Sequence, residues 1–122
     1  MEFTIIIIEA AFFFAMGVVA LIKPALVVQI FGESGIGADM RNEVRAVYGG
    51  FGIAIACTLV ASIKLESIRE GVYVTVAAAL LGMAFGRIIS RLIEKTSGPF
   101  PTIFLTVEVI LASGLLYVCG AF

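Results

Sequence analysis

The sequence predicts an all-α polytopic membrane protein, a bundle of four transmembrane helices with a short interfacial segment after the first. Two observations lead to this fold class. Of the 122 residues, 61% are hydrophobic and only 14% are charged, with a mean hydropathy of +1.17, whereas about a quarter of the residues of a soluble domain are charged. The apolar residues also gather in four stretches of about 20, the length that crosses a bilayer. We expect residues 1–122 to form a single four-helix transmembrane domain.

The predicted spans cover residues 3–22, 42–63, 71–92 and 100–120. The first differs from a cleavable signal peptide because it begins with Glu2 instead of basic residues and its apolar run is longer. A charged turn at residues 64–70 joins the second span to the third, and a turn rich in helix breakers at residues 94–99 joins the third to the fourth. Links this short require antiparallel neighbours.

The link after the first span is longer and has two parts. Pro24 opens an apolar stretch, residues 25–31, that is too short to span and fits a brief helix lying in the membrane interface. Residues 32–37, Gly-Glu-Ser-Gly-Ile-Gly, then form a flexible loop. They are not a nucleotide-binding motif, because the glycine spacing is wrong and no strand precedes them.

Small residues recur at helical spacing in two spans. Gly82 and Gly86 form a GxxxG pattern in the third span, and Gly49, Gly52 and Ala56 line one face of the second. Such faces let helix backbones approach closely inside a bilayer. We expect both faces to pack helices within one molecule, with a contact between two copies as the alternative.

Composition also excludes several function classes. The chain has no histidine, and its two cysteines, Cys57 and Cys119, do not form a CxxC motif. This excludes the common zinc spacings, haem ligation by histidine, and Ser-His or Cys-His dyads. We therefore expect neither a metal nor a cofactor. A net charge of −1 gives no support to nucleic-acid binding, which needs a basic patch.

Basic residues indicate the orientation in the membrane. We call the side of the N-terminus side A, and the side of the first and third links side B. Near the span ends, side A has Lys64 and Arg69. Side B has four basic residues: Lys23, Arg41, Arg91 and Lys95. The positive-inside rule then predicts that side B is cytoplasmic and both termini are extracytoplasmic. We expect a multi-pass protein of a prokaryotic cytoplasmic (inner) membrane.

Four ionisable residues lie within the predicted spans: Glu9, Arg45, Arg87 and Glu108. A charge near the bilayer centre costs about 2.5–3.5 kcal/mol on insertion scales, so such side chains should face the protein interior and find partners. At 1.5 Å per residue, Glu108 lies roughly 12 Å from the side B start of its span. Arg45 and Arg87 occupy the same half of the membrane, whereas Glu9 lies in the half nearer side A.

The helical faces agree with these depths. Arg45, Tyr48, Gly49 and Gly52 are spaced i, i+3, i+4 and i+7 along one stripe, and Glu108 shares a stripe with Leu105, Ala112 and Leu115. We predict that Arg45, Arg87 and Glu108 approach one another, with Tyr48 as a hydrogen-bond partner. Three interpretations remain open: a structural network, a ligand or proton site, and arginines that reach the head groups.

Four short motifs resemble those of the small bacterial four-helix membrane proteins catalogued as a domain of unknown function. They are Asn-Glu-Val-Arg-Ala-Val-Tyr-Gly-Gly at residues 42–50, Gly-Arg-Ile-Ile-Ser at residues 86–90, Gly98-Pro99, and Glu108. The family pattern reads N-x-x-R-A-x-Y-G-G, G-R-hydrophobic-x-S, a G-x-P turn and a late glutamate; here Gly98 is followed directly by Pro99. The resemblance implies the four-helix fold, singles out Arg45, Tyr48, Arg87 and Glu108, and implies no activity. The bundle also distantly resembles DoxX-type membrane proteins, some of which partner quinone-linked oxidoreductases.

We expect a non-enzymatic module that binds a small or lipid-like molecule, or a membrane partner, through the buried cluster of Arg45, Tyr48, Arg87, Glu108 and Glu9. An anionic head group suits the two arginines. One alternative is a proton-coupled carrier or membrane enzyme with Glu108 as acid or base; the lack of His, Asp and Lys inside the spans counts against elaborate catalysis. The other is a purely structural accessory subunit. The expected partners are the lipid bilayer, an anionic or lipid-like molecule, and a second copy or another membrane protein.

Overall fold

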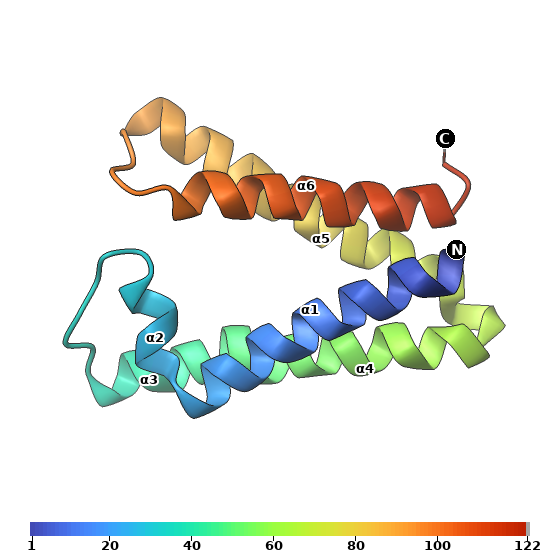
Figure 1. Cartoon of the computed structure of the whole chain (residues 1–122), viewed down its shortest axis with the longest axis horizontal. Coiled ribbons are helices and arrows are strands. Elements are labelled where there is room, and N and C mark those ends of the chain that lie inside the picture. Colours follow the sequence, from blue (N-terminus) through green and yellow to red (C-terminus); the bar gives the residue numbers. More distant parts are fainter. Residues whose placement is uncertain (122) are drawn as a thin grey trace. The chain divides into compact units, whose positions relative to one another are not determined.

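The computed structural model describes residues 1–121, and every regular element in that part of the chain is a helix (Figure 1). The elements are α1 (Glu2–Ile22), α2 (Pro24–Gln29), α3 (Ala38–Val44), the π-helix η1 (Arg45–Gly50), α4 (Phe51–Lys64), α5 (Glu66–Ile93) and α6 (Phe100–Val118). Four helical stretches are long and apolar enough to cross a membrane: α1, the continuous stretch Ala38–Lys64, α5 and α6. The predicted fold class is confirmed, and the chain is a multi-pass membrane protein.

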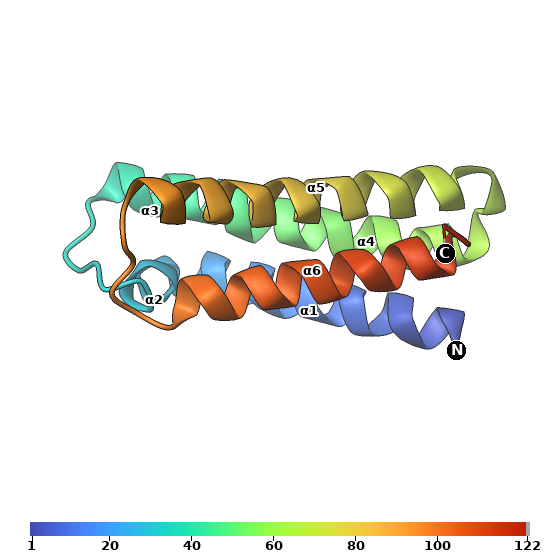
Figure 2. The ribbon, with the colours of Figure 1, turned by 90° about the horizontal axis from the view of Figure 1, so that it is seen from above.

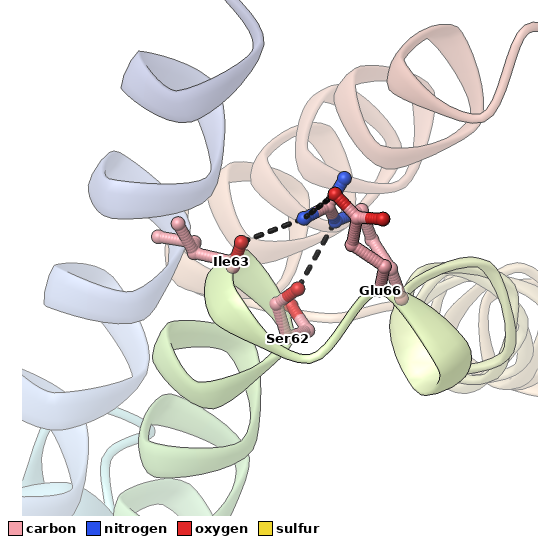
Figure 3. A network of polar contacts seen from close by, with 4 residues as sticks. Ser62, Ile63 and Glu66 are labelled. Carbon is pink, nitrogen blue, oxygen red and sulfur yellow. Dashed lines mark hydrogen bonds and ion pairs between the residues drawn. The ribbon is translucent and has the colours of Figure 1, made fainter.

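The charged turn predicted at residues 64–70 is wrong. α4 ends at Lys64 and α5 begins at Glu66, so Leu65 alone separates them. The reason is Arg69, whose Nε donates to the Ser62 carbonyl oxygen at 3.0 Å and whose Nη2 donates to that of Ile63 at 2.6 Å (Figure 3). These bonds satisfy carbonyls at the end of α4 that lack a partner within the helix. A longer connecting turn is therefore unnecessary.

The longer link contains the predicted short helix and the predicted loop. α2 begins at Pro24. The first N–H groups of a helix have no acceptor within the helix, so the N–H that proline lacks costs no hydrogen bond there. Gly32 and Gly35 follow with φ of 88° and 69°, a backbone conformation that residues with a side chain rarely adopt. The chain re-enters a helix at Ala38, earlier than the predicted start at residue 42.

The chain divides into two compact units. Residues 6–61 form the first, which we call the α1–α4 unit. There α1 and the stretch from η1 into α4 lie against each other through glycines. A Cβ added to Gly17 would lie 2.8 Å from the Gly49 carbonyl oxygen, and one added to Gly52 would lie 3.0 Å from that of Phe13. With Ala56 also buried, the predicted close packing along this face is confirmed.

Met1–Ile5 and the chain from Ser62 onward form the second unit, the α5–α6 unit. α5 and α6 run side by side, joined by residues 94–99. The buried residues of α5 follow helical spacing: Tyr73, Val76, Ala77, Leu80 and Ala84. Figure 2 shows the pair from above.

The prediction that the GxxxG pattern of α5 packs within the molecule is wrong. Gly82 and Gly86 are exposed, and a Cβ added to either would meet no atom within 4 Å in residues 1–121 apart from its chain neighbours and the nearby backbone of α5. Each glycine follows a buried residue, Leu80 or Ala84, by two positions. Two positions turn a helix by about 200°, so the glycines lie on the opposite face.

Many large apolar side chains are exposed on the spanning helices. They include Phe14 on α1, Phe51 on α4, Phe85 on α5 and Ile110 on α6. A soluble monomer rarely exposes apolar side chains on this scale, whereas hydrocarbon is the solvent that suits them. The exposed surface of the helices is therefore consistent with contact with the lipid bilayer.

Candidate functional site

The α5–α6 unit brings Arg87 and Glu108 together. Nε of Arg87 donates to both carboxylate oxygens of Glu108 at 2.9 Å, and its Nη2 lies 2.8 Å from Oε1. The Glu108 side chain is 6% exposed and that of Arg87 is 27% exposed. Glu108 lies on the buried stripe of α6 with Ala112 and Leu115, as predicted. The two charges cancel, which lowers the free energy of keeping both inside a membrane.

Two neighbouring contacts were not predicted. The Arg87 guanidinium lies 5.4 Å from the centre of the Phe104 ring, close enough for a cation–π interaction. One turn further along α5, Nη2 of Arg91 donates to the Thr102 hydroxyl. Helical spacing could have predicted that these residues lie near the pair, because Phe104 precedes Glu108 by four positions and Arg91 follows Arg87 by four.

This geometry limits what Glu108 can do chemically. Its two oxygens already accept three contacts from Arg87. A substrate or a proton would therefore have to compete with a guanidinium fixed at hydrogen-bonding distance. Glu108 is better placed to hold Arg87 in position than to transfer protons.

Arg45 and Tyr48 belong to the α1–α4 unit, in the π-helix η1. Nε of Arg45 donates to the carbonyl oxygen of Leu21 at 3.0 Å, near the end of α1. Its terminal amino groups form no hydrogen bond or ion pair within residues 1–121. Tyr48 is 42% exposed. The meeting of Arg45 and Tyr48 with Arg87 and Glu108 stays a prediction.

The residues of the predicted stripe, Arg45, Tyr48, Gly49 and Gly52, differ in burial. Both glycines are buried, whereas Arg45 and Tyr48 are exposed. Arg45–Gly50 form the π-helix, in which each backbone hydrogen bond spans one more residue than in an α-helix. Arg45 still lies on the same side as Gly49, because both lie next to Leu21 of α1.

Glu9 differs from the other predicted site residues. It is 1% exposed, and neither of its carboxylate oxygens has a hydrogen-bond partner. A buried polar group without a partner is rare and costly in a native structure. α1 contains no other ionisable residue beyond Glu2, and Phe51–Ala61 of the facing helix contain only Cys57.

The remaining chemistry-bearing residues do not gather around a metal. Within residues 1–121, no group of three or more His, Cys, Asp or Glu side chains is placed to hold a metal ion. Cys57 and Cys119 are both free thiols. Among the predicted site residues, the candidate functional features are the Arg87–Glu108 pair, the exposed Arg45 and Tyr48 of η1, and the buried Glu9.

Comparison with known proteins gives one match. The family described as "Domain of unknown function (DUF4345)" matches residues 3–119, which is nearly the whole chain. No curated protein and no solved structure matches the sequence.

Proposed function

We propose that this chain, which belongs to the DUF4345 family of unknown function, is a non-enzymatic membrane module that binds the anionic head group of a lipid-like molecule near side B. The observation that carries the proposal is the π-helix η1. Single π-turns within α-helices occur frequently at functional sites. Here the π-turn coincides with the Arg-Ala-x-Tyr-Gly-Gly motif at residues 45–50.

The residues of η1 differ in their exposure. Gly49 is buried, and a Cβ there would lie 2.7 Å from the Leu21 side chain, so this face is occupied by α1. Arg45 and Tyr48 are exposed, although Arg45 also reaches the Leu21 carbonyl oxygen of α1. Arg45 uses only Nε on Leu21, which leaves the edge of its guanidinium free for bidentate contact with a phosphate or carboxylate. The Tyr48 hydroxyl can add a hydrogen bond to the same class of ligand.

The α5–α6 unit, considered by itself, offers Arg87 as a separate candidate contact for an anionic head group. Glu108 and Phe104 fix its guanidinium, yet the side chain remains 27% exposed. An arginine that is already oriented loses less conformational freedom when a ligand binds. In this proposal, Glu108 therefore positions Arg87 and does not contact the ligand.

Lipid retention tests the proposal directly. The protein is purified in mild detergent, and its bound lipids are counted by native mass spectrometry with equal amounts of anionic and zwitterionic lipid. Arg45→Ala should reduce retention of anionic lipid about tenfold or more, because a hydrogen bond to a charged group contributes about 1.5–3 kcal/mol. Lys95→Ala, which removes another side B charge, is the matched control. Equal retention by Arg45→Ala and the wild type would overturn the proposal.

Melting curves separate binding from helix capping by Arg45. If Arg45 only satisfies the end of α1, Arg45→Ala lowers the melting temperature equally with and without anionic lipid. If it binds the head group, the lipid-induced rise in melting temperature is lost, because a ligand stabilises only the state that binds it. Tyr48→Phe should lose part of that rise while leaving the lipid-free melting temperature unchanged.

Orientation is part of the proposal, because side B must face the compartment that supplies the ligand. We expect side B to be cytoplasmic and both termini to be extracytoplasmic. A C-terminal fusion to a reporter that is active only outside the cytoplasm should therefore be active. Strong signal from a cytoplasm-only reporter at the same position would reverse the assignment.

A second candidate function, proton binding inside the membrane, is favoured by Glu9. Its carboxyl group is buried without any partner, whereas Glu108 is fully engaged by Arg87. An unpaired charge at such a site is costly, and the protonated acid avoids that cost. Glu9 is therefore a better proton site than Glu108, the residue that the sequence favoured for acid–base work.

A hydrophobic carbodiimide distinguishes the two carboxyls, because it modifies protonated acids in apolar surroundings. We expect peptide mass spectrometry to find the adduct on Glu9 and none on Glu108. Glu9→Gln should abolish labelling, and Arg87→Ala should make Glu108 reactive by removing its counter-ion. Labelling of Glu108 in the wild type with Glu9 unmodified would rule out Glu9 as the proton site.

A further inference from the structure

A cavity of about 230 Å³ lies within the α5–α6 unit, near the end where the chain begins and α6 finishes. Its lining includes Glu2 and Phe3 from the N-terminus, Arg69, Glu70 and Tyr73 from the first two turns of α5, and Cys119 just after α6. All of these residues are near span ends on side A. They lie outside the site proposed above, which uses side B. The volume is sufficient for several water-sized groups.

Tyr73 is the buried polar residue of this cavity. The residue is only 2% exposed, and its hydroxyl forms no hydrogen bond within the described chain, residues 1–121. The hydroxyl oxygen itself is not fully buried. Because Tyr73 lines the cavity, a ligand placed there can form a hydrogen bond with this hydroxyl.

The charges around the cavity select the kind of ligand. Glu2 and Glu70 contribute two carboxylates. Among the lining residues, the cation Arg69 already donates to the Ser62 and Ile63 carbonyls and lies 3.9 Å from Glu66 (Figure 3). Burial and the negative charge of Glu70 both raise the pKa of the Cys119 thiol. The cavity therefore favours a cation over an anion.

We propose that this cavity binds a primary ammonium group, supplied by the head group of an aminophospholipid or by a small free amine. An ammonium group has three N–H donors, and the cavity offers three acceptors: the carboxylates of Glu2 and Glu70 and the hydroxyl of Tyr73. A quaternary ammonium carries the same charge but has no N–H to donate. Binding should therefore distinguish ethanolamine from choline head groups.

Cys119 reports occupancy of the cavity. In a Cys57→Ser background, Cys119 is the only thiol, and its alkylation by a small maleimide measures access. The protein is reconstituted in nanodiscs of either phosphatidylethanolamine or phosphatidylcholine. We expect alkylation to be about tenfold slower with phosphatidylethanolamine, since one charge-assisted hydrogen bond corresponds to that factor in occupancy. Equal rates in the two lipids, with and without free ethanolamine, would overturn the proposal.

A second arm separates the two sources of ammonium. Free ethanolamine is added to the phosphatidylcholine nanodiscs. If it slows alkylation at millimolar concentration, the cavity accepts a free amine. If only the lipid form protects Cys119, the source is the head group. Protection by both assigns the ammonium group itself as the recognised chemistry.

Tyr73→Phe tests the contact without unfolding the protein. The hydroxyl has no protein partner, so its removal should leave the melting temperature in phosphatidylcholine unchanged while abolishing the protection by ethanolamine. Glu70→Gln should weaken protection about tenfold. Glu66→Gln, one turn earlier on α5 and not part of the lining, is the matched control and should behave like the wild type. Full protection in both Tyr73→Phe and Glu70→Gln would contradict the assignment, whether or not lipid binding at side B is found.

Discussion

The two units hold their helices together by different means. In the α1–α4 unit, glycines let backbone atoms of one helix touch the other, at Gly17 against Gly49 for example. In the α5–α6 unit, α5 buries larger side chains such as Tyr73 and Leu80, and Arg87 bridges to Glu108. Small residues recur at helical spacing in both units, yet Gly82 and Gly86 face open space. A pattern of small residues thus predicts a helix face without bulky side chains. Whether another helix packs on that face depends on whether the face coincides with the buried residues of the helix.

The largest effect is expected where the α5–α6 interface is charged. Arg87→Ala leaves the buried Glu108 carboxylate without a partner, and breaking a buried pair in this way costs about 3–5 kcal/mol. Glu108→Gln should be much milder, because Arg87 is partly exposed and can turn toward the head groups. Melting curves in detergent measure both. In the Arg87→Ala background, adding Glu108→Gln should recover stability; no recovery would show that the stranded charge is not the cause.

Gly17→Ala breaks the other kind of interface. The added Cβ would lie 2.8 Å from the Gly49 carbonyl oxygen and 2.9 Å from the Ile53 nitrogen, and backbone atoms cannot turn aside as side chains do. We expect a loss of about 3 kcal/mol, the upper end for overpacking. Chemical unfolding of the purified variant measures the loss. A variant as stable as the wild type would mean that the two helices separate freely at this point.

Arg69→Ala should have an intermediate effect. It removes two charge-assisted hydrogen bonds to the carbonyls that end α4, and we expect a loss of about 1.5 kcal/mol. Glu66→Ala removes only an exposed ion pair at 3.9 Å, so its effect should be small. Hydrogen exchange of the amides around Leu65 localises the change. Equal effects of the two variants would assign the stability to the ion pair and not to the carbonyl bonds.

The smallest effect, of opposite sign, is expected at Gly86→Ala. Apart from its chain neighbours and the nearby backbone of α5, the added Cβ would meet no atom of the described chain within 4 Å. Alanine also favours a helix over glycine by about 1 kcal/mol. The melting temperature should therefore rise slightly, in contrast to Gly17→Ala. A clear loss of stability that depends on protein concentration would instead reveal a second copy packed on this face.

The sequence was sufficient for features that depend on length and regular periodicity. Apolar length located the four spans, and the depth of Arg87 and Glu108, counted along regular helices, predicted that they approach each other. The buried stripe of Glu108, Ala112 and Leu115 follows from an unbroken α-helical repeat.

Features that depend on a local change of repeat could not be predicted in this way. The residue types of Arg45–Gly50 are compatible with both α- and π-helix, so neither the π-helix nor the difference in exposure between Arg45 and Gly49 was predicted. The single-residue link at Leu65 depends on the hydrogen bonds that the Arg69 side chain donates to the Ser62 and Ile63 carbonyls. The side A cavity depends on the approach of residues distant in sequence, such as Glu2 and Tyr73, and Tyr73 alone looks like any aromatic residue of a span.

The Arg87–Glu108 pair has a consequence for how the protein enters the membrane. A single span carrying an unpaired charge near its middle costs about 2.5–3.5 kcal/mol to insert. Residues 94–99 are the whole connection between α5 and α6, so both spans leave the ribosome in quick succession. Inserted together as a hairpin, they enter with no net charge from this pair. The partner of each charge is then already present at biogenesis, and α5 need not wait in the bilayer with an uncompensated arginine.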